Sequence, residues 1–164
     1  MIFELKDFYV DLVDNKDLDE VAKVYNSNRH FLLSHMDKEK VTIEWILQEL
    51  KSMKEVGFNS CKIVEISSGN MLGVIDFKTG EETYLSLLMV HNDFKGKGIG
   101  KLIFESFEKY AKLQKSKSIR IDVVTHYDNS VLDFWIKSGF LKIKDVELNW
   151  TGKTLPAITM KKNL

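Results

Sequence analysis

Apolar positions in the first 40 residues predict one strand followed by one helix. Apolar and polar residues alternate weakly over residues 8–13, which is typical of a half-buried strand. Asp17 lies three residues before Glu20, as in a capping box, and predicts the start of a helix. The segment 26–40 is irregular and is expected to be a connection. The apolar positions of the helix share one face, namely Leu18, Val21, Ala22 and Tyr25.

A second helix and three strands are predicted next. Thr42 can cap the helix, and Gly57 lies where a helix is expected to end. Strand-like runs follow at 60–66, 71–77 and 83–90, separated by "SSGN" and "KTGEE". Short polar separators that contain glycine indicate an antiparallel meander. The apolar stripe of the helix consists of Ile43, Ile46, Leu47, Leu50 and Met53.

The remaining pattern alternates helices with strands. A long helix after residue 100 is followed by a strand at 118–124, a helix at 129–139, and strands at 140–148 and 157–162 joined by "NWTGK". A helical crossover makes the strands at 83–90 and 118–124 parallel neighbours. The order predicts an α/β (α+β) protein with a mixed, mostly antiparallel sheet of six to seven strands and helices on both faces. The long helix should turn inward Ile103, Phe107, Tyr110, Ala111 and Leu113.

Composition indicates an ordinary globular protein with a single domain over residues 1–164. Lys plus Arg and Asp plus Glu number 24 each, and a net charge of zero argues against a protein that binds duplex nucleic acid. Charged residues interrupt the first 15 positions, so we expect no signal peptide there. No apolar run approaches about 18 residues, so we expect a cytoplasmic protein without a membrane partner. The single cysteine, Cys61, allows no internal disulfide.

The segment "KGKGIGK" lies between a predicted strand and a predicted helix. Glycines let a ligand approach the backbone, the start of a helix offers unpaired N–H groups, and lysines add positive potential. These are the elements of a phosphate-binding loop. The spacing matches neither G-x-x-x-x-G-K-[ST] nor G-x-G-x-x-G, because position 95 is a lysine and the third glycine comes one residue early. The simpler alternative is a tight turn, for which one glycine would suffice.

Gly98 and Gly100, with Lys95 three residues before Gly98, resemble the [R/Q]-x-x-G-x-[G/A] signature of the GCN5-related N-acetyltransferase family. "LLMVHNDF" is similar to that family's V-x-P-x-[Y/F], although Asn92 replaces the proline and Lys95 the usual Arg or Gln. The resemblance implies the acyl-CoA N-acyltransferase fold and acetyl-CoA as cosubstrate. It implies that pyrophosphate is bound by Lys95, Gly96, Lys97, Gly98, Ile99, Gly100 and Lys101. It also implies that pantetheine pairs with the backbone of Leu88, Met89 and Val90.

"DNSVLDFWIKSGF" resembles the second family signature, N-x-x-A-x-x-[F/L]-Y-x-x-x-G-F. Trp135 stands at the usual tyrosine, which in the family is thought to protonate the departing thiolate. Indole cannot act as a general acid, so Trp135 is expected to pack on the cofactor or hydrogen-bond near its sulfur. Tyr127, Tyr84 or solvent could supply the proton. Asn129 is one residue out of register and either reaches the cofactor or caps the helix.

The chemistry also needs a group that removes the amine proton. Glu82, near the start of the strand before the loop, is one candidate base, and its alternative role is that of a solvated turn residue. His126, at the end of the strand at 118–124, is another, because imidazole titrates near neutrality. The alternative for His126 is a strand-end histidine that faces water. Other acidic or imidazole groups near the strand before the loop are Glu81, Asp76 and His91.

The predicted function is transfer of an acetyl group from acetyl-CoA to a primary amine of a small molecule or peptide by direct attack. The alternative is a non-catalytic acyl-CoA-binding module or sensor, because Trp135 occupies the acid position. The acceptor site is expected in residues 26–40. His30 and His35 have no partner ligands, so no metal is expected. Exposed end strands could also pair two copies into a homodimer.

Overall fold

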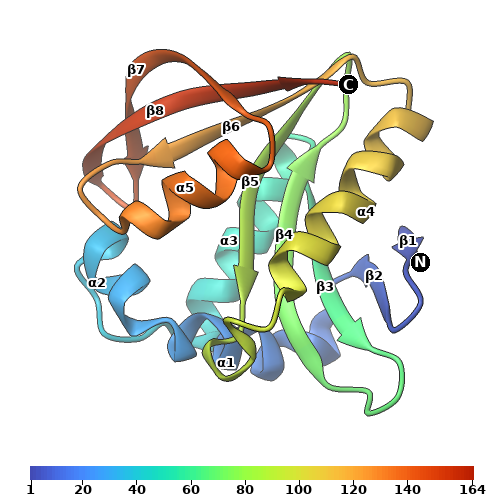
Figure 1. The fold of residues 1–164 in the computed structure, drawn as a ribbon. Coiled ribbons are helices and arrows are strands. Elements are labelled where there is room, and N and C mark those ends of the chain that lie inside the picture. Colours follow the sequence, from blue (N-terminus) through green and yellow to red (C-terminus); the bar gives the residue numbers. More distant parts are fainter.

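The computed structural model describes residues 1–164 and contains one eight-stranded sheet (Figure 1). The strand order is β1-β2-β3-β4-β5-β6-β8-β7, and every pair is antiparallel except β5–β6. The predicted meander and the predicted parallel pair are thus confirmed, and a two-residue β1 helps to bring the strand number to eight. The strands are β1 Phe3–Glu4, β2 Phe8–Leu12, β3 Asn59–Glu65, β4 Met71–Lys78, β5 Glu82–Val90, β6 Ser118–Val124, β7 Leu141–Trp150 and β8 Lys153–Asn163.

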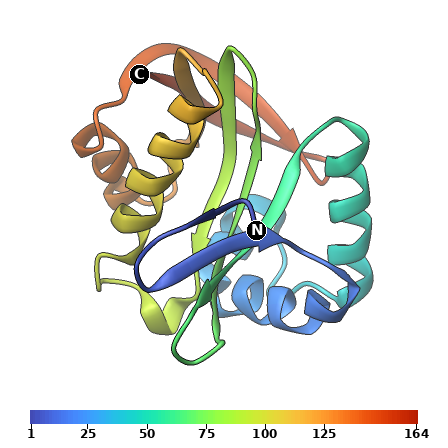
Figure 2. The ribbon, with the colours of Figure 1, turned by 90° about the vertical axis from the view of Figure 1, so that its right-hand side faces the viewer.

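Five α-helices cover the sheet in two layers (Figure 2). Helices α4 (Ile99–Leu113) and α5 (Asn129–Lys137) pack on one face and share an 18-residue apolar cluster with it. Helices α1 (Leu18–Ser27), α2 (Arg29–Met36) and α3 (Ile43–Glu55) contribute to a second cluster of 11 buried residues. No helix is both long and apolar enough to cross a lipid bilayer.

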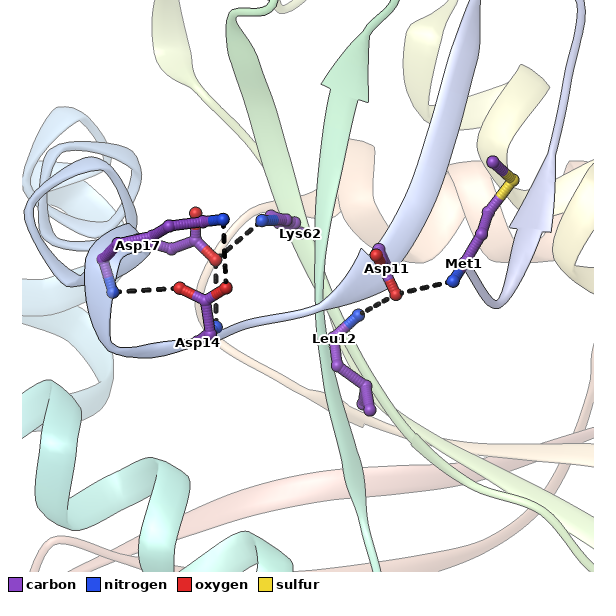
Figure 3. Close-up of polar contacts among 7 residues, drawn as sticks. Met1, Asp11, Leu12, Asp14, Asp17 and Lys62 are labelled. Carbon is purple, nitrogen blue, oxygen red and sulfur yellow. Dashed lines mark hydrogen bonds and ion pairs between the residues drawn. The ribbon is translucent and has the colours of Figure 1, made fainter.

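The capping box lies one turn earlier than the sequence predicts. Asp14 accepts a hydrogen bond from the Lys16 backbone, and the Asp17 carboxylate accepts one from the Asp14 N–H at 2.9 Å (Figure 3). Asp17 also forms an ion pair of 2.7 Å with Lys62 of β3. Because Asp17 is held by these partners, it makes no side-chain cap for α1, and the predicted box with Glu20 is wrong.

Helix α2 lies in the segment that the sequence predicts to be an irregular connection. Its ends carry no strong signals, because Asn28 makes no side-chain cap and the helix stops at Asp37 with a left-handed φ of 54°. Tertiary contacts stabilise it instead. Lys153 of β8 donates to the Ser34 carbonyl at 3.1 Å and pairs with Asp37 at 2.7 Å.

Three residues predicted to face inward are exposed. Leu113 is 80% exposed because it is the last residue of α4. Ile43 and Leu47 of α3 are each 44% exposed, whereas Ile46 is buried. Helix α3 therefore buries a narrower stripe than its apolar residues suggest.

Candidate active site

The parallel strands β5 and β6 separate after three residue pairs. Residues 82–84 pair with 118–120, and β5 then continues to Val90 with β4 as its only strand partner. At its end, the Val90 carbonyl accepts a hydrogen bond from the Asn28 side chain at 3.1 Å. Figure 1 shows β6 leaning away from β5 towards the β7–β8 hairpin. The His91 N–H donates to Leu72 on the β4 side at 2.7 Å, so the preceding main-chain N–H of Val90, and that of Leu88, point into the split. A polar ligand can pair with the backbone there as an added strand would.

A cradle of backbone N–H groups closes the mouth of this split. Gly96 and Gly98 adopt left-handed φ values of 76° and 77°, and no atom lies within 4 Å of a Cβ built at either residue. Helix α4 begins directly after them. The backbone N–H groups of residues 96–101 have no acceptor within the protein. Six such donors at a helix start, with the positive charges of Lys95 and Lys97 beside them, fit an anion such as a pyrophosphate.

The start of α5 differs from the sequence expectation. Asp128 is the cap, because its carboxylate accepts from the Ser130 N–H at 2.9 Å and from the Ser130 hydroxyl at 2.7 Å. Asn129 is the first residue of the helix and is exposed. Its predicted capping role is therefore wrong, while a contact with the coenzyme stays a prediction.

Trp135 lies in the apolar core beside α4. Its side chain is 8% exposed and packs edge-on against the rings of Phe104, Phe134 and Phe140. Phe134 is also the residue nearest to the Cβ position of Gly100, at 3.9 Å. These contacts join α5 to the first turn of α4, so Trp135 supports the loop from behind.

Replacing Trp135 with Phe tests this supporting role. We expect the free energy of unfolding to fall by about 1–2 kcal/mol, because the smaller ring leaves part of the core unfilled. The dissociation constant for CoA, measured by calorimetry, should stay within about twofold of the original value. A tenfold weaker affinity with unchanged stability would instead show that the indole touches the coenzyme.

A polar network marks the apex of the split, where β5 and β6 are still paired. Tyr84 donates to the Asp122 carboxylate at 2.9 Å, and Thr159 donates to it at 2.6 Å. Arg120 pairs with Asp122 at 2.8 Å and stacks 4.5 Å from the centre of the Tyr84 ring. Burial alone would raise the pKa of Asp122, but these hydrogen bonds outweigh it and lower the pKa. Asp122 is therefore a fixed anion at the apex.

The cavity beside this apex has a volume of about 370 Å³. Glu82 lines it and forms an ion pair of 2.6 Å with Lys161 of β8. Side chains alternate along β5, so Glu82 projects from the same face as Tyr84. The predicted base Glu82 therefore lies two residues before Tyr84, whose pair with Arg120 is the last one between β5 and β6.

The other two predicted catalytic residues lie at the opposite end of β6. His126 is exposed with a left-handed φ of 59°, in the turn between β6 and α5. Tyr127 stacks on His30 with ring centres 4.8 Å apart and meets His35 edge-on at 4.8 Å. The structure therefore does not bring either residue to Glu82. Their catalytic roles stay predictions.

Part of the predicted acceptor segment forms an aromatic cluster. His35 stacks on Phe31 at 3.9 Å, and both rings contact Trp150 at the end of β7. Burial lowers the pKa of His35 to about 4, so this imidazole is neutral near pH 7. The cluster fixes α2 against the β7–β8 hairpin.

Asp76 is a buried carboxylate on β4 without a cationic partner. It lines a cavity of about 10 Å³, room for one water molecule, together with Tyr25, Glu49 and Ser60. Burial raises its pKa to about 7; the nearby Ser60 hydroxyl lowers the pKa and the Glu49 charge raises it further. The sequence indicates Asp76 as a candidate base because it lies near the strand before the loop. That it has no cationic partner can be seen only in the fold.

A mostly antiparallel sheet that splits between two parallel strands, with an anion cradle at the mouth of the split, defines the acyl-CoA N-acyltransferase fold. The family model described as Acetyltransferase (GNAT) domain matches residues 32–164. The chain therefore belongs to the GNAT acetyltransferase family and is an acetyl-CoA-dependent acyltransferase. A search of curated proteins gave no match.

Solved structures with the same fold cover nearly the whole chain. An acetyltransferase from Thermus thermophilus has a TM-score of 0.79 and 22% identity, covering 96% of this chain and 97% of that one. A ribosomal-protein-S5-alanine acetyltransferase from Vibrio fischeri has a TM-score of 0.71 and 18% identity, with coverages of 98% and 95%. The yncA protein from Salmonella typhimurium, solved with its cofactor acetyl-CoA, has a TM-score of 0.67, 14% identity and coverages of 97% and 95%.

Proposed function

We propose that the chain transfers the acetyl group of acetyl-CoA to a primary amine of a small molecule or peptide. The observation that carries this proposal is the row of six unpaired N–H groups at residues 96–101, beside a strand whose main chain faces an open split. Pyrophosphate requires such donors, and the pantetheine arm requires a free strand edge. The residues present therefore fit acetyl-CoA.

In the proposed mechanism, the loop and β5 position the coenzyme. The N–H groups of Gly98, Ile99 and Gly100 bind the pyrophosphate, and Lys95 and Lys97 add positive potential. Main-chain groups of Leu88 and Val90 hold the pantetheine arm along the split, and a strand N–H polarises the thioester carbonyl. The arm then points along β5 towards the apex at Tyr84.

Acetyl-CoA supplies an electrophilic carbonyl carbon, to which the amine nitrogen bonds while the carbon–sulfur bond breaks. Glu82 is proposed to accept the amine proton, directly or through water, once its ion pair with Lys161 opens. The thiolate leaves with the bonding electrons and takes a proton from solvent or a tyrosine, for which Tyr84 is placed at the apex. His126 and Tyr127 are the alternative proton-transfer groups, at the mouth of the split.

The first test is ligand-dependent stability. CoA or acetyl-CoA at about 100 times its dissociation constant should stabilise the fold by about 2.7 kcal/mol and raise Tm by about 5–10 °C. ATP and NAD should have little effect, because the loop matches neither of their motifs. No response to either CoA species would contradict the proposal.

The second test separates an enzyme from a sensor. An enzyme releases free thiol from acetyl-CoA at a rate that depends on added amine, and this is the expected result. The alternative, a non-catalytic acyl-CoA-binding module, is favoured by one observation, the absence of a tyrosine at position 135. Binding of acetyl-CoA without amine-dependent thiol release would establish that alternative.

A further inference from the structure

The cavity beside the apex carries equal numbers of both charges. Its lining contains three acidic side chains, on Glu82, Asp122 and Glu147, and three basic ones, on Arg120, Lys144 and Lys161. Its volume of about 370 Å³ falls in the range of small-molecule sites. A polycation would meet as many like charges as opposite charges there, and so would a polyanion.

This cavity opens on the face of the sheet opposite to α4 and α5. Ile119, Ile121 and Val123 of β6 belong to the apolar cluster that contains the buried side chains of those helices. Because side chains alternate along a strand, Arg120 and Asp122 point to the other face. A molecule in the cavity can therefore approach the apex of the split without crossing the helices that flank the loop.

Arg120 offers a fixed cation with a free donor. The ring of Tyr84 and the Asp122 carboxylate hold its guanidinium in place. Its Nε atom is buried and has no hydrogen-bond partner in the protein. A buried donor without an acceptor costs free energy, and guanidinium groups bind planar carboxylates well. The unpaired Nε favours an anionic group on the ligand, and the equal numbers of acidic and basic side chains favour a ligand that also carries a positive charge.

We propose that the acceptor is amino-acid-like, with a carboxylate next to the primary amine that is acetylated. The carboxylate binds Arg120, and the ammonium group faces Glu82, to which it loses its proton before attack. This assignment rests on the proposed function. It explains why the apex cavity contains both the fixed guanidinium of Arg120 and the carboxylate of Glu82. The present partner of Glu82 is the flexible side chain of Lys161, which an ammonium group can replace.

The test compares matched acceptors that differ only by the carboxylate. Thiol release from acetyl-CoA would be measured for the twenty amino acids and, in parallel, for amines that lack the carboxylate, such as ethylamine beside alanine and 2-phenylethylamine beside phenylalanine. Rates would be compared at equal concentrations of unprotonated amine, since the two series differ in amine pKa. We expect at least one amino acid to exceed its decarboxylated twin at least tenfold in kcat/KM.

Variants of Arg120 separate binding from folding. Arg120→Met should lower the preference for the amino acid, taken as the ratio of its kcat/KM to that of its decarboxylated twin, at least tenfold, mainly through a higher KM of the amino acid. Arg120→Lys should recover part of the preference, because it keeps the charge but loses the fork. Lys109→Met removes an exposed cation on α4 and should leave both substrates unaffected.

Two results would overturn the amino-acid assignment without affecting the coenzyme site. One is equal rates for both members of every pair. The other is that no amino acid is acetylated although CoA binds. An equal loss for both members of a pair in Arg120→Met would also overturn it, because it would show a merely structural role. Failure of CoA to bind the unaltered protein would instead remove the proposed function itself.

Discussion

Gly98→Glu is expected to weaken the binding of CoA at least 100-fold. The new carboxylate would project from the cradle, into space that is open within 4 Å, where the pyrophosphate must lie. Two like charges about 4 Å apart near a protein surface repel by about 4 kcal/mol, and every 1.4 kcal/mol is roughly a factor of ten in affinity. Calorimetric titration with CoA measures the loss directly.

The change also has a backbone cost, and Gly69→Glu controls for it. Gly69, in the turn between β3 and β4, has a left-handed φ of 73° and equally open surroundings. Both variants should lose a similar amount of stability in urea denaturation, since both force a side chain into the left-handed region. Only Gly98→Glu should lose affinity. Retained CoA binding in that variant would place the pyrophosphate elsewhere.

Local pattern was enough to predict the elements that carry the coenzyme site. The meander, the loop and the parallel crossover each depend on residues close together in the chain, such as Gly96 and Gly98 at the start of α4. The site is also built from backbone groups, so departures such as Asn92 for proline leave its geometry in place. A glycine-rich strand-to-helix turn is a strong local signal.

The acceptor side could not be predicted in the same way. The apex cavity joins Glu82 on β5, Arg120 on β6 and Lys161 on β8, which are about 40 residues apart in sequence at each step. Their pairing depends on strand register, which no local pattern reveals. Helix α2 escapes prediction for the same reason, because its stability comes from contacts with Lys153 and Trp150 far along the chain.

The buried aspartates Asp76 and Asp122 show how the same residue type can have opposite effects on stability. Hydrogen bonds lower the pKa of Asp122, so its carboxylate stabilises the fold above about pH 4, and this contribution is lost as pH falls. Asp76 has only the nearby Ser60 hydroxyl to offset its burial. Tyr25 of α1, Glu49 of α3, and Ser60 and Cys61 of β3 surround it, and none carries a positive charge.

Asp76→Asn is therefore expected to stabilise the protein above pH 7. Burial raises the pKa of Asp76 from 3.8 to about 7, so the folded chain holds this proton more tightly than the unfolded chain. The free energy of unfolding then falls as pH rises from about 4 to about 7. Above pH 7 the folded chain bears the full cost of an ionised, buried Asp76 carboxylate, up to about 4 kcal/mol. Asparagine cannot ionise and avoids that cost.

Urea denaturation at pH 4 and pH 8 measures this difference. The variant should match the original protein near pH 4, where Asp76 is protonated in the folded state, and exceed it at pH 8. Asp122→Asn should show the opposite sign at pH 8, because it removes a carboxylate that Arg120 and Thr159 stabilise. A stability difference between Asp76→Asn and the original protein that does not change with pH would contradict this prediction. It would mean that a counter-charge or solvent reaches the Asp76 carboxylate, so that its pKa is not raised by burial.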